Sequence, residues 1–426
     1  MSQHLWYPFT PIDSPPPLPV VRGEGAWLEL ADGRRILDAI SSWWVTLHGH
    51  SHPAIADAIH RQALQLEQVI FAGFTHVPAE QLAAELTTLL PPGLDRVFYS
   101  DDGSTAVEVA LKLARQVWTN RGEDRRRFIA FEGAYHGDTF GAMAVGARSL
   151  FTRAYDPLLF EVAFAPYPET WIGDTDVAAR EAAALAELER LLREQPTAAI
   201  ILEPLMQGAS GMRLSRPEFL QQVASLARAH GTLLIFDEVM TGFGRTGDWF
   251  ACQRAGVTPD LICLSKGLTG GFLPMGATVA SEAIYDAFRG QEPERTFWHG
   301  HSYTANPLGC AAALASLELL RQAEPVVRGF EARHRQHLET LADHPRLRRL
   351  RTLGTIAALE VGDPGVSGDD GGYLSSYGPR LRVLALEEGV LLRPLGNILY
   401  LLPPLCLSDS ELAGVYGAIA HILDRL

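Results

Sequence analysis

Lysine is almost absent from this chain. Only Lys112 and Lys266 occur in 426 residues, and every other strongly basic side chain is an arginine. An arginine guanidinium keeps its proton, whereas a desolvated lysine amine can lose its proton and attack a carbonyl group to form a Schiff base. The two lysines are therefore the first positions to consider for chemistry.

The two lysines have different surroundings. Lys266 ends a short apolar run that begins at Pro259, and three glycines follow it within five residues. This pattern predicts a buried strand that delivers an amine to a glycine-lined site. Lys112 lies four residues after Glu108 in a segment with helical periodicity, so an ion pair on a helix surface explains it. Lys266 is the candidate nucleophile.

An excess of positive charge is also missing. The formal net charge is -14 and the isoelectric point is near 5.5, which argues against a surface for nucleic acid or for an anionic membrane. One locally basic stretch, which we interpret as a solvated face, contains Arg346, Arg348, Arg349 and Arg351. The expected partners are small-molecule substrates.

The sequence has few cysteines and no long apolar run. Its four cysteines lack metal-ligand or redox spacing, which fits reduced thiols in an intracellular protein. The apolar segment 398–407 is interrupted by two prolines, and the first 20 residues do not resemble a signal peptide, so we expect a cytoplasmic protein. No metal site is expected, because the candidate histidines lie in loop-like segments: His48, His50, His52, His299 and His301.

From about residue 54, apolar segments alternate with segments of helical periodicity. We predict strands at residues 96–99, 127–131, 161–165, 198–202, 233–237, 261–264 and 277–280, with helices such as 179–193 and 217–230 between them. This alternation predicts an α/β domain with a largely parallel sheet. A long helix over about residues 305–323 leads into a smaller α+β unit. We therefore divide the chain at these points: residues 1–53, a large domain of residues 54–315, and residues 316–426.

Two predicted strand ends carry groups that could hold a phosphate and a protonated ring nitrogen. After strand 96–99, a helix begins at Gly103 and Ser104, and its free N–H groups could cradle a phosphate. The same letters also make an ordinary helix cap. Asp237 ends an apolar strand, where a buried carboxylate needs a cationic partner such as a protonated pyridine nitrogen. An ion pair with an arginine explains Asp237 alone equally well.

A third strand end adds an aromatic side chain. Tyr135 and His136 follow strand 127–131 in a loop framed by glycines, and such a tyrosine could stack on a flat ring, although an exposed loop tyrosine needs no ligand to explain it. Along the chain, the order is phosphate cradle, stacking aromatic, ring-nitrogen carboxylate and Schiff-base lysine. This combination predicts a pyridoxal 5'-phosphate site in which Lys266, Asp237 and Tyr135 are catalytic.

A competing motif lies between Asp237 and Lys266. Residues 242–247 have the pattern G-x-G-x-x-G after a strand, as a dinucleotide-binding turn would. The first glycine, however, lies four residues beyond Glu238, and the motif is followed by Asp248-Trp249-Phe250 instead of a helix start. An oxidoreductase is the minor alternative.

Two glycine-rich segments carry a family signature. They are DEVMTGFGRTG at residues 237–247 and SKGLTGG at residues 265–271, and they resemble the signature of class III pyridoxal-phosphate aminotransferases. The resemblance runs nearly end to end, from LWYPFT at residues 5–10 to Leu392-Arg393-Pro394. The N-terminal run and the SSWW of residues 41–44 are most similar to members that aminate 8-amino-7-oxononanoate with S-adenosylmethionine in biotin biosynthesis.

The resemblance implies a type I pyridoxal-phosphate transferase fold. Such proteins have a large, mixed, mostly parallel sheet domain, a smaller α+β domain from both chain ends, and a homodimer with active sites at the interface. The implied cofactor-binding residues are Gly103, Ser104, Tyr135, His136, Asp237, Lys266 and Ser302, and Ser302 would reach the phosphate of the partner subunit. The implied substrate-binding residues are Trp43, Tyr135, Arg245, Gly300 and Arg393, and Arg393 would meet the carboxylate of the keto substrate.

Four residues bear on the substrate. Phe9 stands where the family commonly has tyrosine, and His301-Ser302 stands where it commonly has Pro-Thr. Ala209 stands where relatives that act on ordinary α-amino acids often carry a glutamate that masks the arginine. An unmasked arginine fits a substrate whose carboxylate is always remote. Transamination of ω-amino acids, ornithine or 4-aminobutyrate is the alternative function, and some relatives use lysine as the amino donor.

Overall fold

The computed structural model describes residues 4–364 and 375–426. Its main element is a seven-stranded sheet of order β4-β12-β11-β10-β7-β5-β6, in which β12 alone runs antiparallel to its neighbours. The strands are β4 Leu94–Ser100, β5 Arg127–Phe131, β6 Val162–Ala165, β7 Thr197–Leu202, β10 Leu233–Asp237, β11 Leu261–Leu264 and β12 Gly276–Ser281. The predicted α/β architecture with a mostly parallel sheet is confirmed.

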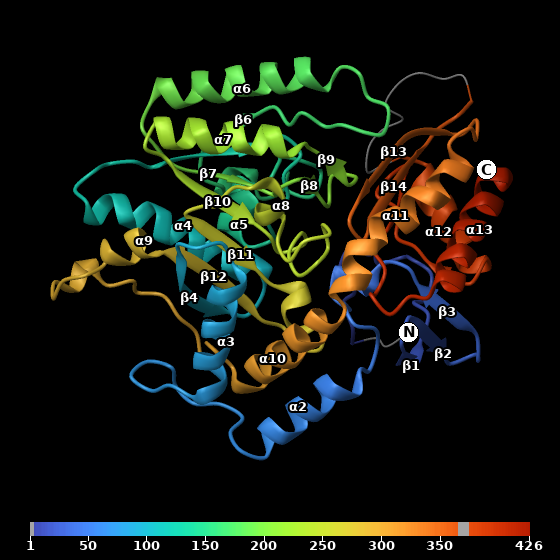
Figure 1. The fold of residues 1–426 in the computed structure, drawn as a ribbon, viewed down its shortest axis with the longest axis horizontal. Coiled ribbons are helices and arrows are strands. Elements are labelled where there is room, and N and C mark those ends of the chain that lie inside the picture. The colour runs from blue at the N-terminus through green and yellow to red at the C-terminus, as the bar shows by residue number, and fades with distance from the viewer. Residues whose placement is uncertain (1–3, 365–374) are drawn as a thin grey trace.

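Helices cover both faces of this sheet (Figure 1). In β10, Leu233 and Ile235 pack in one apolar core with α4 (Gly103–Asn120), whereas Leu234 and Phe236 pack in another core with α7 (Pro217–Ala229). Because both faces are buried, the strand sequences are continuously apolar instead of alternating. The remaining helices of this part are α2 Pro53–Ala63, α3 Val77–Leu89, α5 Phe140–Val145, α6 Val177–Glu194, α8 Ala251–Ala255, α9 Glu282–Asp286 and α10 Pro307–Gln322.

Smaller sheets stand beside the main sheet (Figure 1). One has the order β1-β2-β3-β15 and another the order β13-β14-β16. Their strands are β1 Val20–Glu24, β2 Trp27–Leu30, β3 Arg35–Asp38, β13 Leu347–Leu353, β14 Ile356–Val361, β15 Val390–Leu391 and β16 Ile398–Leu401. They are accompanied by α1 Ser41–Trp44, α11 Glu324–Leu341, α12 Tyr377–Glu387 and α13 Asp409–Arg425. Both chain ends thus share one sheet. The domain boundaries at residues 53 and 315 stay a prediction, and residue 315 lies inside α10.

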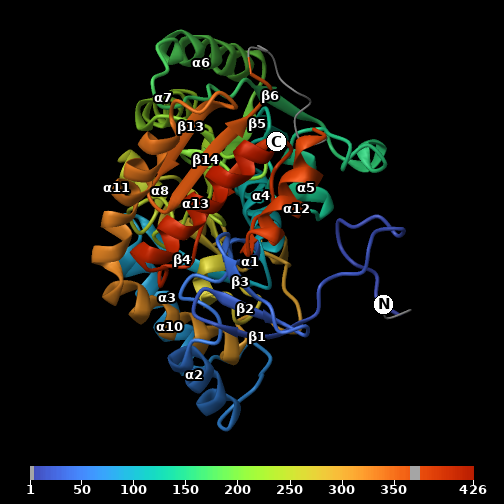
Figure 2. The same cartoon turned by 90° about the vertical axis from the view of Figure 1, so that its right-hand side faces the viewer.

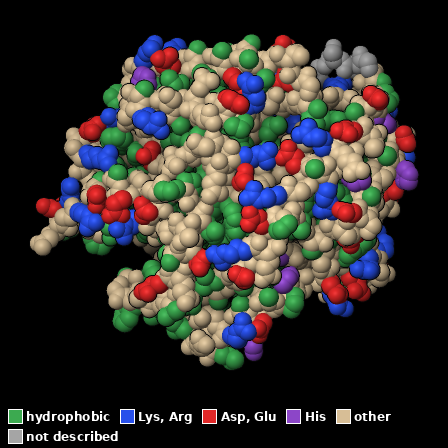
Figure 3. All heavy atoms as spheres, in the orientation of Figure 1, with side chains coloured by type: hydrophobic (Ala, Val, Ile, Leu, Met, Phe, Trp, Pro, Cys, Tyr) green, Lys and Arg blue, Asp and Glu red, His purple; other side chains and the backbone are tan. Residues whose placement is uncertain are grey.

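The surface shows no segregation of charge on the face drawn in Figure 3, where basic and acidic side chains are interspersed. Over the described part of the chain, every helix is too short or too polar to cross a membrane. The described N-terminal segment extends away from the sheets (Figure 2), and this segment exposes large apolar side chains such as Trp6 and Ile12.

The ends of parallel strands position the predicted chemistry. β10 ends at Asp237, β11 ends two residues before Lys266, β4 ends three residues before Gly103, and β5 ends four residues before Tyr135. In open α/β sheets, ligands bind outside the carboxyl ends of the parallel strands. This edge of the main sheet is therefore where the site is expected.

Candidate active site

A cavity of about 1410 Å³ opens at this edge of the main sheet. It is lined by eight of the eleven predicted site residues, namely Trp43, Gly103, Ser104, Tyr135, His136, Asp237, Lys266 and Arg393. Trp43 and Arg393 come from the two chain ends, whereas the other six come from segments that follow strands of the main sheet. The cavity thus lies where the main sheet meets the smaller sheets.

Lys266 follows β11 in a strained backbone conformation. Its φ is +46°, a left-handed value that a residue with a side chain adopts at a cost and that occurs preferentially at functional sites. The ammonium lies 4.8 Å from the ring centroid of Trp44. Desolvation lowers the pKa of the Lys266 amine, against the opposing effect of the negative charges of Asp237 and Glu203. A lowered pKa increases the fraction of neutral amine, which is the nucleophilic form.

Asp237 is a buried carboxylate with a histidine partner. Its Oδ2 lies 2.7 Å from Nδ1 of His136, and its Oδ1 accepts a hydrogen bond from the N–H of Val239. The other ring nitrogen of His136, Nε2, is buried without a hydrogen-bond partner among the described residues. A buried polar atom of this kind at a cavity wall is explained by a ligand that reaches it.

The start of α4 offers free backbone donors to the cavity. The Asp102 carboxylate accepts the N–H of Thr105 at 2.8 Å, and among the described residues the N–H groups of Gly103 and Ser104 have no hydrogen-bond acceptor. A Cβ on Gly103 would lie 2.6 Å from Cγ1 of Val239, so only glycine fits there. Two free N–H groups at the positive end of a helix suit a phosphate.

The sequence analysis did not single out Glu203 as part of the site. Its two carboxylate oxygens accept the N–H groups of Tyr135 at 3.1 Å and of Gly208 at 2.8 Å. Burial raises the pKa of Glu203 to about 7. The residue ties the loop that carries Tyr135 to the loop that begins at Gly208. An acid immediately after a buried strand, as at Asp237, was the signal that could have found it.

Arg393 is a cavity cation without a counter-ion. Its guanidinium lies 4.8 Å from the ring centroid of Trp43, and neither an ion pair nor a hydrogen bond of Arg393 occurs among the described residues. The ring of Phe9 packs edge-on against Trp43 at 5.5 Å. Because Phe9 has no hydroxyl group, this part of the wall offers an arginine and aromatic surfaces. Such a guanidinium can bind a carboxylate through two hydrogen bonds.

Three predicted site residues lie outside the cavity. The role predicted for Arg245 stays a prediction: its side chain is buried, and it donates to the Pro403 carbonyl at 2.7 Å and to the Ser41 hydroxyl at 3.0 Å. Burial lowers the pKa of Arg245 to about 9. In this structure, Arg245 links the segment that follows β10 to both chain ends through these two hydrogen bonds. Gly300 and Ser302 are exposed and do not line the cavity of their own subunit.

The basic stretch of residues 346–351 is not simply a solvated face. Arg348, Arg349 and Arg351 line the same cavity as Lys266, and Arg351 is only 2% exposed. A count of charges does not show that residues 347–353 form a strand, β13, in which alternate residues share a face. The cavity wall is thus more cationic than the sequence analysis predicted.

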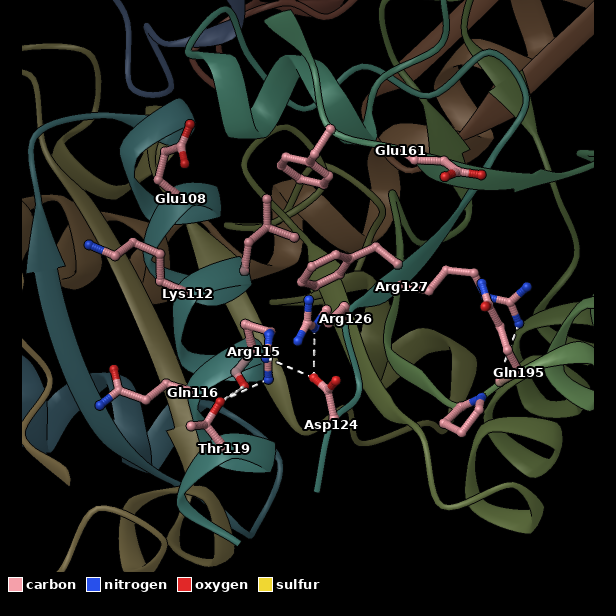
Figure 4. Close-up of a pocket in the computed structure, with 14 residues that line it drawn as sticks. Glu108, Lys112, Arg115, Gln116, Thr119, Asp124, Arg126, Arg127, Glu161 and Gln195 are labelled. Carbon is pink, nitrogen blue, oxygen red and sulfur yellow. Dashed lines mark hydrogen bonds and ion pairs between the residues drawn. The ribbon is translucent and has the colours of Figure 1, made fainter. Parts of the chain in front are cut away.

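A second hollow, of about 980 Å³, lies along the exposed side of α4 (Figure 4). Lys112 and Glu108 both line it, but Lys112 contacts His299 at 2.9 Å, and Glu108 accepts backbone N–H groups of the segment that begins α5. The predicted ion pair between them is therefore wrong. Asp124 forms ion pairs with Arg115 at 3.1 Å and with Arg126 at 2.7 Å. Lys112 has a structural partner and lies apart from the cavity of Lys266.

The residues of the cavity fit pyridoxal phosphate. A reactive amine, a buried carboxylate, an aromatic side chain that is 38% exposed and free N–H groups at a helix start all line one space. The G-x-G-x-x-G segment 242–247, in contrast, folds as turns, and α8 begins only at Ala251. It therefore lacks the helix that receives a dinucleotide phosphate.

Comparisons with known proteins agree with this chemistry. The family described as Aminotransferase class-III matches residues 10–423. A curated adenosylmethionine-8-amino-7-oxononanoate aminotransferase of Synechococcus elongatus is 62% identical over 99% of this chain and 99% of its own. The crystal structure of an adenosylmethionine-8-amino-7-oxononanoate aminotransferase from Methanocaldococcus jannaschii is 34% identical, with a TM-score of 0.89 over 98% of this chain and 97% of that one.

A further solved structure bears on the cofactor. It is an amine transaminase from an uncultivated Pseudomonas species, described in its pyridoxal-phosphate-bound form, which is 32% identical with a TM-score of 0.91 over 100% of this chain and 99% of that one. The fold, the matched residues and the chemistry of the cavity lead to the same assignment. The chain belongs to the class III aminotransferases and is a pyridoxal-phosphate-dependent transaminase of the type I fold.

Proposed function

We propose that this enzyme transfers an amino group from S-adenosylmethionine to 8-amino-7-oxononanoate, which yields 7,8-diaminononanoate in biotin biosynthesis. The names of the Synechococcus and Methanocaldococcus relatives support this substrate pair. The observation that carries the proposal is the guanidinium of Arg393, which lines the cavity over Trp43 without a counter-ion among the described residues.

Arg393 suits a substrate whose carboxylate is remote from the reacting carbon. Ala209 also lines the cavity, and its methyl group cannot pair with the guanidinium, so Arg393 stays available to a carboxylate. The oxononanoate carries its carboxylate at the far end of an alkyl chain. Phe9, Trp43 and Phe151 line the cavity with aromatic surface, which favours the burial of such a chain.

We propose that the residues at the strand ends hold the cofactor. The N–H groups of Gly103 and Ser104 would bind its phosphate, Tyr135 would lie against its ring, and Asp237, oriented by His136, would face the ring nitrogen. When bound, pyridoxal phosphate supplies an electron sink for carbanion chemistry. The negative charge of Asp237 favours the protonated form of a ring nitrogen beside it.

Lys266 would attach the cofactor and move the proton. As a free amine during transfer, its Nζ would accept the proton of the donor's α-carbon and, with the acceptor, deliver a proton to the carbon that receives the amino group. The lowered pKa of Lys266 supports this role, because desolvation keeps more of the amine neutral. Trp44 restricts the space around Nζ, since its ring centroid is 4.8 Å away.

We also propose a homodimer in the cytoplasm with active sites at the interface. Gly300 and Ser302 are exposed outside the cavity of their own subunit, and Ser302 would complete the phosphate site of the partner while Gly300 would contact the substrate there. Leu5 is 61% and Trp6 86% exposed on the N-terminal segment, and exposed apolar groups of this size favour association. The four cysteines are free thiols, which suits a reducing compartment.

Separate half-reactions test the proposal. The holoenzyme is mixed with S-adenosylmethionine, lysine or alanine without an acceptor, and the absorbance of the cofactor is followed as it takes up the amino group. We expect conversion by S-adenosylmethionine and reversal when 8-amino-7-oxononanoate is added. Reversal by ω-amino acid-derived aldehydes but not by the oxononanoate would favour ω-amino acid, ornithine or 4-aminobutyrate transamination. Conversion by lysine alone would change the donor and keep the acceptor.

A further inference from the structure

A second group of arginines lines the substrate cavity. We call Arg213, Arg349 and Arg351 the arginine triad. Arg349 and Arg351 lie two residues apart on β13, so their side chains leave the same face of the strand. Arg213 belongs to the short strand β9 (Arg213–Leu214). All three line the cavity that also contains Lys266 and Arg393.

The arginine triad has fewer negative partners than positive charges. Glu169 lies 3.0 Å from Arg349, 3.4 Å from Arg213 and 3.7 Å from Arg351. Glu360 lies 3.4 Å from Arg351 and 3.8 Å from Arg349. Strong charge-assisted bonds are about 2.7–2.9 Å long, so one contact approaches that length and the other four are loose. Two carboxylates are shared among three guanidiniums. Arg213 also donates to the Glu132 and Tyr167 carbonyls and to the Gln207 side chain at 3.2–3.3 Å, so the capacity for another anion lies at Arg349 and Arg351.

Arg351 has a buried hydrogen-bond donor that no acceptor reaches among the described residues. Its side chain is 2% exposed, and its Nε has no hydrogen-bond partner among the described residues. Its nearest backbone acceptor is the Gly211 carbonyl, at 3.4 Å from a terminal nitrogen. A buried cationic donor without an acceptor is unfavourable, and a ligand carboxylate in the cavity would relieve this cost.

The backbone places the arginine triad within reach of Arg393. Ile398 follows Arg393 by five residues and pairs across the sheet with Glu360, a partner of the triad. Five extended residues span at most about 17 Å, and the actual separation is shorter because Leu395 and Ile398 close a turn. The side chains of Leu395 and Ile398 both line the cavity. An alkyl chain can therefore run along this segment between two cationic ends.

We propose that the arginine triad is a second carboxylate-binding subsite, which takes one end of a linear α,ω-dicarboxylate while Arg393 takes the other. The inference rests on the proposed role of Arg393 and extends the ligands of the cavity to acids with two remote carboxylates. The incoming carboxylate replaces Glu169 at Arg349, whose side chain is 39% exposed and thus accessible. Arg351, held at the back of the subsite, supplies its unfilled donor.

Binding of simple acids to the holoenzyme tests this subsite without catalysis. Heptanedioate and heptanoate are titrated calorimetrically, and the ratio of their dissociation constants is the measurement. We expect the dicarboxylate to bind about tenfold to a hundredfold more tightly than the monocarboxylate. Arg349→Gln should bring the ratio close to one. The matched control is Arg346→Gln, because Arg346 pairs with Asp363 at 3.1 Å and does not line the cavity, and it should preserve the ratio.

Glu169→Gln separates a ligand subsite from a structural ion-pair cluster. Removing the competing charge should tighten heptanedioate binding, whereas a purely structural cluster would be loosened by this substitution and by Arg349→Gln alike. A ratio near one for the wild type at every chain length from five to nine carbons, or an unchanged ratio in Arg349→Gln, would overturn the inference. If the oxononanoate is not aminated but the ratio stays high, the proposed function fails and the subsite stands.

Discussion

Replacing Arg393 by glutamine should impair capture of the keto substrate far more than reaction with the amino donor. The guanidinium has no ion-pair partner among the described residues and packs over Trp43, so the proposed substrate carboxylate is its main electrostatic partner. Hydrogen bonds to charged groups contribute about 1.5–3 kcal/mol, which corresponds to a roughly tenfold to hundredfold rise in KM for the oxononanoate. Since no internal ion pair is broken, the thermal midpoint should change little.

The assay is a pair of single half-reactions followed through the absorbance of the cofactor. The donor half-reaction with S-adenosylmethionine and the acceptor half-reaction with 8-amino-7-oxononanoate are each measured over a range of substrate concentrations. Arg346→Gln serves as the control, because Arg346 is half-buried like Arg393 but lies outside the cavity. Equal losses in the two half-reactions would refute the reasoning, because one arginine would then serve the carboxylates of both substrates.

Three further substitutions test the rest of the site. Lys266→Ala should abolish transamination, because the other lysine, Lys112, contacts His299 away from the cavity; reductive labelling and peptide mapping that placed the cofactor on Lys112 would contradict the assignment. Asp237→Asn should retain the cofactor but lose about a hundredfold to a few thousandfold in turnover, since breaking a buried ion pair costs about 3–5 kcal/mol; near-normal turnover would make Asp237 structural. Glu203→Gln tests pH dependence: burial raises the pKa of Glu203 from 4.5 to about 7, so the folded state holds the proton more tightly, and the wild type loses stability as pH rises from about 4.5 to about 7. Glutamine at position 203 cannot ionise, so the thermal midpoint of the variant should rise relative to that of the wild type as the pH increases across this window. A difference in midpoint that does not change with pH would argue against the raised pKa of Glu203.

The main sheet could be predicted closely because its information is local. β5, β10 and β11 have the predicted bounds to the residue, since each is a short apolar run with polar residues or glycine near its ends. Strands buried on both faces need continuous apolar sequence, which a single chain reveals without knowledge of its neighbours. The sequence could place Lys266 at the cavity for the same reason, because the strand before it and the glycines after it are close in sequence.

The arginines were harder to place because a buried guanidinium depends on acceptors that come from elsewhere in the chain. Arg245 donates hydrogen bonds to Pro403 and Ser41, which are 158 and 204 residues away in the sequence. The residues around Arg245 give no indication of these partners. Arg351 lies next to a carboxylate of Glu169 only because β13 packs against the cavity. A local charge count treats such residues as solvated, since water is the default partner of an arginine. The surroundings of a side chain whose partners are distant in sequence can therefore be known only from the folded structure. In this enzyme such side chains include arginines that line the cavity.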